Sequence, residues 1–583
     1  MLRMSGALIL AALPLFHGAV LKDFESPPYT NLFAIPLPIS PIKEPKFNTT
    51  DPQTGRPINY YEIEIKSFSK NFYPDLANAT LVGYDGMVPG PTFKMERGVQ
   101  SIVRFINNAE LPNSVHLHGS YSKSAWDGWA DDITQPGEFK DYFYPNNQSA
   151  RTLWYHDHAV DITAVNAYFG QFGTYILHDP EEDALNLPSG EYDIPLMIGT
   201  KQFNADGTLF NPADETTSLY GDIVVVNGEP WPFLAVEPRK YRFRLINVGD
   251  SRSFQFYFTD ADSSASVTDK RATTKDDPVN QLPFYVIGSD TGLLTNPVLT
   301  TTLYHSIAER YEIIFDFSPF AGQKITLRNT GDVAADTDYL YTDRVMQFQV
   351  SSEPVTDTSV VPSTLREIEF PSVANKSTAN PDHTFTFERQ NGDWRINGIG
   401  WDMVDQRVLA RPPVGATEIW ELVNGGGGWS HPVHVHLVDM HVIARTGGNI
   451  GRGVEPYEDK GLKDVVWLGP SETVFVEAAY QPWDGLYMFH CHNLIHEDHD
   501  MLAAFNVTQL VELGYNDTIF LDPRQDTFAP EANTADKLTE SSIMDKIDFL
   551  ASLQPYGDIA EREQRIKDYY DDNPEEEFED EDD

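Results

Sequence analysis

Short segments in which apolar and polar residues alternate recur through most of the chain, separated by turn residues. Residues 92–94, 241–246, 311–317 and 473–476 are examples, rich in β-branched and aromatic side chains. This period of two is typical of strands with one buried face. The 39 glycines and 40 prolines are spread throughout, as many turns require. Helical periodicity is scarce, and residues 536–553 are the best helix candidate. The pattern predicts an all-β protein.

An internal repeat divides this β pattern into three copies. Residues 101–107 (SIVRFIN), 241–247 (YRFRLIN) and 418–424 (EIWELVN) are alternating strands that each end in asparagine. A second alternating strand follows in each copy, at residues 116–118, 254–258 and 434–436. Such self-similarity predicts three consecutive β-domains. The first and third copies carry histidines on the second strand and the middle copy does not, so we expect a metal-free middle domain.

The repeat and shifts in composition predict the domain boundaries. We expect a signal peptide at residues 1–19, an N-terminal arm at 20–54, a first domain at 55–180, a second at 181–351, a linker at 352–383, a third domain at 384–530, and a C-terminal helix with an acidic tail at 531–583. The polar segment 259–282 is expected to be a surface loop. Residues 561–583 hold 13 acids and three bases. We expect this tail to be a disordered solvated segment, with a removable propeptide or a partner contact as alternatives.

The net charge and the N-terminal segment bear on the partners and the location of the protein. There are 42 basic and 88 acidic residues, a net charge of 42 − 88 = −46, which argues against a nucleic-acid partner. Arg3, an apolar run at residues 7–16 and small residues at 18 and 19 are typical of a secretory signal. That run is too short to span a membrane. We expect a secreted monomer, glycosylated at some of the sequons at Asn48, Asn78, Asn147, Asn375, Asn506 and Asn516.

Histidines are concentrated in pairs with one residue between them. The four pairs are His116/His118, His156/His158, His434/His436 and His490/His492. Residues i and i+2 of a strand point to the same face, so each pair offers two imidazoles to one point. A single pair would usually be an ordinary core or surface feature, but four pairs in two repeat copies indicate metal binding. We expect two or three ions between the first and third domains, and imidazole alone leaves Cu, Zn, Fe and Ni open.

Cys491 is the only cysteine and lies between His490 and His492. On a strand its thiol would therefore point away from both imidazoles. Two histidines, a thiolate and a weakly bound methionine form a blue-copper electron-transfer site. A buried apolar cysteine is the alternative, whereas structural zinc sites favour two or more cysteines. The candidate ligands for such a blue-copper site are His431, Cys491, His496 and Met501.

These segments together resemble a known family. Residues 116–119 (HLHG), 154–158 (WYHDH), 431–436 (HPVHVH) and 490–501 (HCHNLIHEDHDM) are similar to the four copper-binding motifs of the multicopper oxidases. Residues 117–120, 127–130 (DGWA) and 461–467 (GLKDVVW) resemble in particular the bilirubin oxidases of fungi. The likeness covers most of residues 55–525. It implies three consecutive cupredoxin-like Greek-key β-barrel domains.

The resemblance also implies four copper ions per chain and their ligands. By matching motifs, the type 1 copper would take His431, Cys491, His496 and Met501. The type 2 copper would take His116 and His434. The type 3 pair would take His118, His156, His158, His436, His490 and His492. The remaining histidines are interpreted as ordinary residues: His17, His178, His305, His383, His441 and His499.

The activity implied by the resemblance couples two half-reactions. A small aromatic or tetrapyrrole reductant would lose one electron at a time to the type 1 copper, through the exposed edge of His431 or His496. The trinuclear cluster would reduce dioxygen to water with four electrons. Two alternatives stay open. One is an oxidase of Fe(II) or Cu(I), although the 11 methionines form no Met-rich insertion. The other is a copper carrier or a coat protein of a pigment layer.

Five further side chains are candidates for supporting roles. By resemblance, Asp127 and Glu497 would supply protons, with orientation of a ligand or a plain turn position as alternatives. Trp429, two residues before His431, would contact the electron donor or simply pack. An anionic substrate would need positive charge on this acidic protein. Arg445 and Arg452 could provide it, with surface solubility as the other interpretation.

Overall fold

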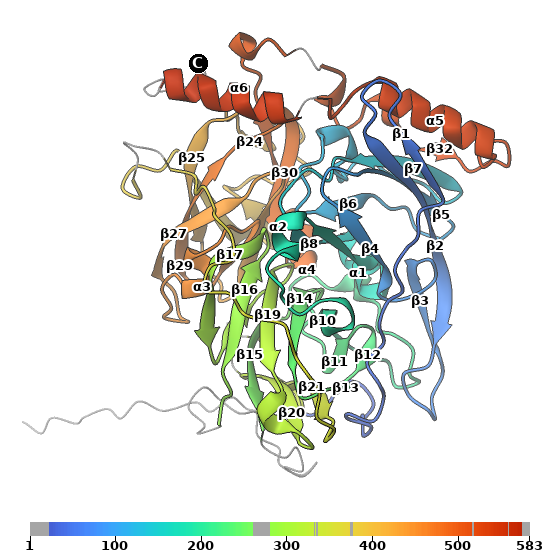
Figure 1. The fold of residues 1–583 in the computed structure, drawn as a ribbon, viewed down its shortest axis with the longest axis vertical. Helices are drawn as coiled ribbons and strands as arrows, with labels where there is room; N and C mark the ends of the chain where they lie inside the picture. The colour runs from blue at the N-terminus through green and yellow to red at the C-terminus, as the bar shows by residue number, and fades with distance from the viewer. Residues whose placement is uncertain are drawn as a thin grey trace, which may run out of the picture.

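The computed structural model describes residues 22–260, 280–331, 333, 336–372, 377–515, 518–557 and 559–573. The expected signal peptide, residues 261–279 of the polar segment, and Asn375 and Asn516 lie outside these ranges. The described chain folds mainly into β-sheets, which group into three pairs along the sequence (Figure 1). The all-β prediction is therefore confirmed.

The first pair of sheets comes from the N-terminal third of the chain and one late strand. The larger sheet has the order β1-β2-β5-β7-β32 with β3 on β2, and the smaller has the order β4-β9-β8-β6. Strand β1 lies within the expected arm, so the arm belongs partly to this sheet. The strands are β1 (Phe47–Thr50), β2 (Pro57–Lys70), β3 (Ala79–Tyr84), β4 (Gly90–Glu96), β5 (Gln100–Asn107), β6 (Val115–His118), β7 (Glu138–Tyr144), β8 (Arg151–Asp157), β9 (Phe172–His178) and β32 (Glu531–Ala532).

The second pair lies in the middle of the chain and occupies the lower part of Figure 1. Its sheets have the orders β12-β11-β10-β14-β19-β16-β17 and β13-β21-β20-β15-β18. The strands are β10 (Asp193–Lys201), β11 (Ile223–Val226), β12 (Glu229–Pro230), β13 (Phe233–Val236), β14 (Lys240–Asn247), β15 (Phe254–Thr259), β16 (Phe284–Ser289), β17 (Gly292–Thr300), β18 (Leu303–His305), β19 (Arg310–Asp316), β20 (Lys324–Asn329) and β21 (Arg344–Val350).

The third pair follows the segment expected to be a linker, which lies against the second domain through backbone hydrogen bonds of residues 360 and 365. Its sheets have the orders β23-β22-β25-β29-β27 and β24-β31-β30-β26-β28. The strands are β22 (His383–Gln390), β23 (Asp393–Ile396), β24 (Val408–Ala410), β25 (Thr417–Asn424), β26 (His431–Val435), β27 (Met440–Gly447), β28 (Val465–Leu468), β29 (Glu472–Ala479), β30 (Gly485–Cys491) and β31 (Leu502–Val507).

The sequence repeat corresponds to equivalent strands in the three domains. Strands β5, β14 and β25 each pair in parallel with an earlier strand of their sheet (β2, β10 and β22) and antiparallel with a later one (β7, β19 and β29). The asparagines that end them are Asn107, Asn247 and Asn424. Each side-chain oxygen accepts the N–H two residues on, and each amide nitrogen donates to backbone carbonyls of the following loops. In each domain the asparagine side chain thus provides hydrogen-bond partners for backbone groups at the turn that ends the strand.

The hydrophobic core does not follow the order of the domains. One cluster of buried residues runs through both the first and the third domains, from Ile58 and Trp126 to Val433 and Phe505. A separate cluster fills the second domain. The first and third domains are thus packed together although the second lies between them in the sequence. This packing places the β6 and β26 regions side by side.

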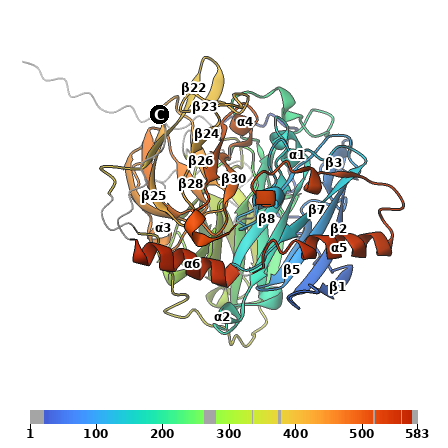
Figure 2. The same ribbon diagram turned by 90° about the horizontal axis from the view of Figure 1, so that it is seen from above.

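Helices are few and lie mainly at the edges of the sheets. They are α1 (Thr163–Phe169), α2 (Pro180–Asp183), α3 (Pro456–Asp459), α4 (Leu494–Glu497), α5 (Glu540–Ser552) and α6 (Ile559–Asp572). Helix α5 confirms the prediction at 536–553. Helices α5 and α6 lie across one end of the molecule, over the first and third domains respectively (Figures 1 and 2).

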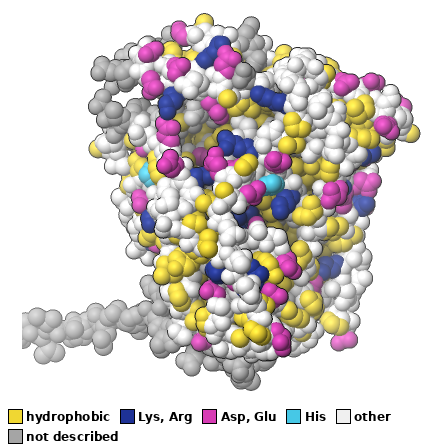
Figure 3. Space-filling model, in the orientation of Figure 1, with side chains coloured by type: hydrophobic (Ala, Val, Ile, Leu, Met, Phe, Trp, Pro, Cys, Tyr) yellow, Lys and Arg dark blue, Asp and Glu magenta, His cyan; other side chains and the backbone are white. Residues whose placement is uncertain are grey.

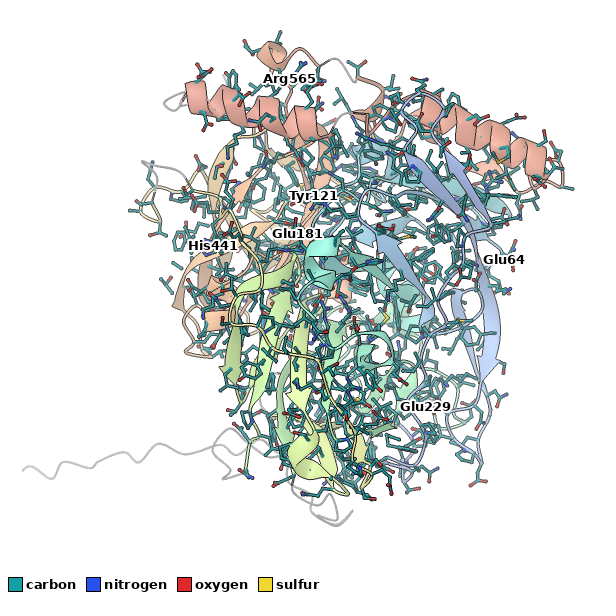
Figure 4. All side chains as sticks on the ribbon, in the orientation of Figure 1. Glu64, Tyr121, Glu181, Glu229, His441 and Arg565 are labelled. Atoms are coloured by element: carbon teal, nitrogen blue, oxygen red, sulfur yellow. The ribbon has the colours of Figure 1, made fainter. Side chains whose placement is uncertain are left out.

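The expectation of a disordered tail is wrong for residues 561–572, which belong to α6. Ile566 packs so closely on Gly415 of the third domain that a Cβ there would lie 2.3 Å from it. Arg562 donates to Asp484 at 2.7 Å. The helix can be found at the top of Figure 4, where its Arg565 is labelled. Burial of the apolar stripe and this ion pair hold the helix down despite its acidic composition. Residues 574–583 lie outside the described ranges.

Acidic side chains are scattered over the face shown in Figure 3, interspersed with basic ones. No helix in the described part of the chain is both long and apolar enough to cross a membrane.

Candidate metal centres

The paired histidines lie on strands that face each other across the first and third domains. In the first domain, His116 of β6 is opposite His156 of β8. In the third, His434 of β26 is opposite His490 of β30. All eight paired histidines are buried, with at most 1% of each exposed. The alternation of the strands brings their rings to one point between the domains.

The ring nitrogens approach one another as ligands around shared ions would. Groups of three ligand atoms within 4.8 Å of one another form there among the described residues. The closest nitrogen–nitrogen distances are 3.4 Å for His116–His434, 3.2 Å for His158–His490, 3.4 Å for His436–His490 and 3.4 Å for His118–His156. The ring of His492 lies 5.1 Å from that of His156, and both its nitrogens lack a hydrogen-bond partner.

The outward nitrogens of these rings are held by oxygen acceptors. His434 Nδ1–H donates to the backbone carbonyl of Asp464 at 2.8 Å, and His436 Nδ1–H donates to Oδ2 of Asp127 at 2.7 Å. Because one nitrogen carries the proton, the nitrogen that faces the cluster presents a lone pair. Burial first, and the neighbouring imidazoles second, lower the pKa of His434 and His436 well below the usual value. Neutral, converging imidazoles fit metal ions and would repel one another without them.

A second, smaller set of ligands surrounds Cys491. Its Sγ lies 3.4 Å from Nδ1 of His431 and 3.6 Å from Nδ1 of His496, and those two nitrogens are 3.3 Å apart. Met501 is fully buried beside them, and its carbonyl accepts the N–H of Cys491 at 3.1 Å. Burial raises the pKa of the Cys491 thiol well above its usual value. A soft cation would offset that cost by binding the thiolate.

The two sets are joined by one strand. Cys491 ends β30 and is bonded to His490 and His492, whose rings belong to the larger set. The thiol and the imidazoles therefore serve different centres, as alternation along a strand requires. The covalent backbone therefore links the Cys491 sulfur to the larger set.

The expected electron contact at an exposed histidine edge is wrong. His431 and His496 are both 0% exposed. The ring of Trp394 stacks on His496 at 3.6 Å, and its Nε1–H donates to the carbonyl of Thr216 at 3.0 Å. Trp429 packs edge-to-face on Trp394 at 5.0 Å and is half-buried. The half-buried ring of Trp429, not an imidazole edge, is therefore the outermost aromatic group beside Cys491, and the fully buried Trp394 contacts both Trp429 and His496.

An open depression of about 420 Å³ lies over Trp429. Its lining includes Trp429, Arg389, Glu388 and the glycine loop 425–427. The Arg389 guanidinium lies 5.8 Å from the ring of Trp429 and 5.1 Å from that of Trp394. The depression thus combines an aromatic wall with a positive charge.

The two candidate proton donors each lie behind a histidine of the larger set. Asp127 accepts from His436, and its other carboxylate oxygen is buried without a partner. Burial raises the pKa of Asp127 well above its usual range. Glu497 has its carboxylate 3.0 Å from Nδ1 of His490 and 3.5 Å from Nδ1 of His158. A shallow depression lined by Asp161, Asp498 and Asp500 reaches Glu497 from outside.

Arg445 and Arg452 are neither a substrate contact nor surface solubilisers. Arg445 is buried and donates to Glu458 at 2.6 Å and 3.1 Å. The side chain of Arg452 is 4% exposed and lies 4.8 Å from the ring of Trp467. Both arginines donate to the backbone carbonyl of Trp467 on β28, and both lie within ion-pair distance of Glu472. A positive charge lies instead at the depression, on Arg389, and only the fold reveals that position.

The remaining described histidines join none of these ligand groups. His441, labelled on the left of Figure 4, belongs to β27 and packs against Phe370. The second domain places Phe254 and Phe256 on the strand equivalent to β6. Each ligand group found in the described ranges comes from the first domain, the third domain or both, and His17 lies outside those ranges.

Comparison with known proteins agrees with this geometry. Sequence models described as multicopper oxidase match residues 68–182 and 373–510. The bilirubin oxidase of Albifimbria verrucaria is 54% identical over 545 residues, covering 91% of this chain and 92% of that protein. The chain belongs to the multicopper oxidase family. It is a copper-dependent oxidoreductase that uses dioxygen as acceptor and an organic reductant as donor.

Other relatives of this multicopper oxidase support the same conclusion. A laccase of Bacillus subtilis (strain 168) is 33% identical, over 82% of this chain and 98% of its own length. The crystal structure of a multicopper oxidase from Pediococcus acidilactici superposes with a TM-score of 0.70 at 25% identity, covering 85% of this chain and 95% of the other. The cupredoxin fold implied by the sequence is confirmed.

Proposed function

We propose that this multicopper oxidase oxidises tetrapyrrole or phenolic substrates one electron at a time beside Cys491, and reduces dioxygen to water among the eight paired histidines. The observation that carries the proposal is the single thiol of Cys491, 3.4 Å and 3.6 Å from two buried imidazoles and bonded to two others that face the larger set. Bound copper would supply the one-electron chemistry and the reduction of dioxygen.

We assign the ligands in the same terms. His431, Cys491, His496 and Met501 would hold the type 1 ion, His116 and His434 the type 2 ion, and the other six the type 3 pair: His118, His156, His158, His436, His490 and His492. The convergence of neutral ring nitrogens supports the type 2 and type 3 assignments. The buried thiol and thioether support the first, because soft ligands select copper.

The protein's own groups would divide the work. Trp429 would stack on the aromatic donor at the depression. Trp394, which contacts both Trp429 and His496, would provide the path for the electron between them. The peptide bonds of Cys491 would connect the two centres. Asp127 and Glu497 would deliver protons, and the acidic depression around Asp161 would connect Glu497 with solvent.

Arg389 would resolve the conflict between an anionic tetrapyrrole and an acidic protein. Long-range repulsion is screened within about 8–10 Å at physiological salt. At the depression, a carboxylate of the substrate would meet the guanidinium, and its rings would meet Trp429. The neighbouring Glu388 would oppose a second anionic group, so one carboxylate at a time is the expected contact.

One experiment tests the proposal directly. Copper per chain, the visible spectrum and oxygen uptake should be measured on the loaded protein, with bilirubin, a phenol and Fe(II) supplied in turn. We expect about four ions, a blue absorption band, and uptake with bilirubin and the phenol. Faster uptake with Fe(II) than with either organic donor would instead favour the metal-ion oxidase. Copper binding without oxygen uptake would favour a carrier or coat protein.

Substitutions at the depression should separate binding from electron transfer. Arg389→Gln should raise KM for bilirubin by about 10-fold or more, because a hydrogen bond to a charged group is lost, and should leave a neutral phenol unaffected. Trp429→Leu should lower kcat for both donors, because it removes the shared contact. Steady-state kinetics with the two donors provide the measurement. Equal effects of Arg389→Gln on both donors would contradict a role in anion binding.

Met501→Leu should raise the reduction potential of the blue centre, because loss of the thioether donor destabilises the oxidised ion. A redox titration followed at the blue band measures it. Met488, buried on the same strand as Cys491, provides the control as Met488→Leu and should leave the potential in place. An unchanged potential in Met501→Leu would remove Met501 from the ligand set.

We also propose that the protein is secreted, glycosylated and monomeric, with domain boundaries close to those expected above. The signal-like N-terminus supports secretion. Among the described sequons, Asn48 and Asn78 are exposed and therefore accessible to modification. Mass spectrometry of the secreted protein before and after glycosidase treatment would test secretion and glycosylation.

A further inference from the structure

Arg310 comes from the metal-free second domain and makes contacts with all three domains. It begins β19 and is 0% exposed. Its Nε–H donates to the carbonyl of Thr152 at 3.0 Å, on the first-domain strand that carries His156. Its two terminal nitrogens donate to the two carboxylate oxygens of Asp464 in the third domain. A buried, two-pronged pair of this kind fixes both position and angle.

Asp464 in turn contacts two histidines of the larger set through different atoms. Its backbone carbonyl accepts Nδ1–H of His434 at 2.8 Å. Its carboxylate Oδ1 accepts Nε2–H of His118 at 3.1 Å. The two rings stack at 3.7 Å with an interplanar angle of 13°. One residue therefore sets the tautomer of a proposed type 2 ligand and of a proposed type 3 ligand.

The surroundings show that this arrangement is built, not accidental. Asp290, also from the second domain, accepts the N–H of Arg310 at 2.7 Å and the N–H of Asp464 at 3.1 Å. Lys463 lies 3.1 Å from Asp290 and completes a buried charge network. Gly119 makes room from the first domain, because a Cβ there would lie 2.6 Å from the guanidinium and 2.7 Å from the Asp464 carboxylate. This close approach explains why the HLHG motif ends in a glycine at this position.

We propose that Arg310 is a positioning residue for the type 2 region of the cluster, so that the second domain helps to build a copper centre to which it gives no ligand. The proposal rests on the ligand assignment in the proposed function. Arg310 acts by holding the carboxylate and the backbone of Asp464, and with them the rings of His118 and His434. Outer contacts of this kind are worth about 10–100-fold in metal affinity or activity.

Arg310→Lys is the decisive variant. Lysine keeps the charge but cannot reproduce the fork that engages both carboxylate oxygens. We expect the blue absorption to be unchanged, because no hydrogen bond of Asp464 reaches Cys491. We expect an altered type 2 signal in electron paramagnetic resonance. In a chelator titration of the loaded protein, the most weakly held copper should be lost at about 10–100-fold lower chelator concentration.

The matched control is Arg242→Lys. Arg242 is another buried second-domain arginine, paired with Glu182 and Glu312, and it contacts none of the histidines. It should keep the wild-type signal and chelator curve. The inference is overturned if Arg310→Lys matches the wild type in both measurements, or if Arg242→Lys shifts them equally.

A second variant covers the case in which Arg310→Lys does not fold. Asp464→Asn keeps the backbone contact to His434 and removes the charged partner of Arg310. It should alter the same signal, and a wild-type signal in it would overturn the inference. A wild-type protein with no type 2 signal would instead refute the proposed function, and this inference with it. The two failures are therefore distinguishable.

Discussion

Cys491→Ser should be colourless and should consume oxygen more than about 1,000-fold more slowly with any organic donor, an increase in barrier of about 4 kcal/mol. The thiol is the one soft anionic donor of its set, and it is bonded to both His490 and His492. A serine hydroxyl is neither soft nor readily ionised, so both the blue centre and the connection to the larger set are lost.

The measurement combines the visible spectrum, copper per chain and oxygen uptake. About three ions should remain, because the serine variant leaves every ring of the larger set in place. The type 2 resonance provides the internal control for folding. A blue, active Cys491→Ser protein, or a loss of all copper, would show that the thiol does not separate two centres as proposed.

The grouping of the paired histidines could be predicted because it depends on local periodicity. A spacing of two on a strand places both histidines of a pair on one face, and a cysteine between two histidines on the other. The repeat that ends in Asn107, Asn247 and Asn424 revealed three equivalent domains, since each asparagine closes the same turn. Each of these signals depends on a few neighbouring residues, so a single sequence is enough to predict the shared faces and the repeat.

The supporting residues could not be predicted because they meet only in the folded chain. Arg310 and Asp464 are 154 residues apart. Trp394 and His496, whose rings stack, are 496 − 394 = 102 residues apart. Nothing in the sequence around Arg389 indicates that it lies beside Trp429. Residues 461–467 were recognised as a family feature, yet nothing in their spacing indicated that Asp464 would hold two rings.

Helix α6 was missed for a different physical reason. The prediction weighed the acids of residues 561–583 together, whereas burial follows the face of a helix. Ile559 and Ile566 are seven residues apart and Tyr570 follows four residues later, so they share one stripe. That stripe packs on the third domain while the acids face solvent. Composition averaged over a segment hides such a pattern.

Asp127→Asn should keep the blue absorption and all copper while slowing oxygen reduction by about 100-fold, within the range typical of a lost proton donor. The amide is nearly isosteric with the carboxyl group, and its oxygen can still accept Nδ1–H of His436. Orientation of the ligand is thereby preserved, and only the capacity to hold and release a proton disappears. Burial raises the pKa of Asp127 well above its usual range and so favours the protonated form more than exposure to solvent would.

The test must separate proton supply from ligand orientation. Turnover should be measured in ordinary and heavy water, and we expect the variant to show a larger solvent isotope effect, because proton delivery becomes limiting. Asp141→Asn is the matched control: Asp141 is a buried first-domain carboxylate paired with Arg104. It should lower stability without changing the isotope effect. A variant Asp127→Asn that turns over at the wild-type rate would assign Asp127 to orientation of His436 alone, because the amide retains that one contact.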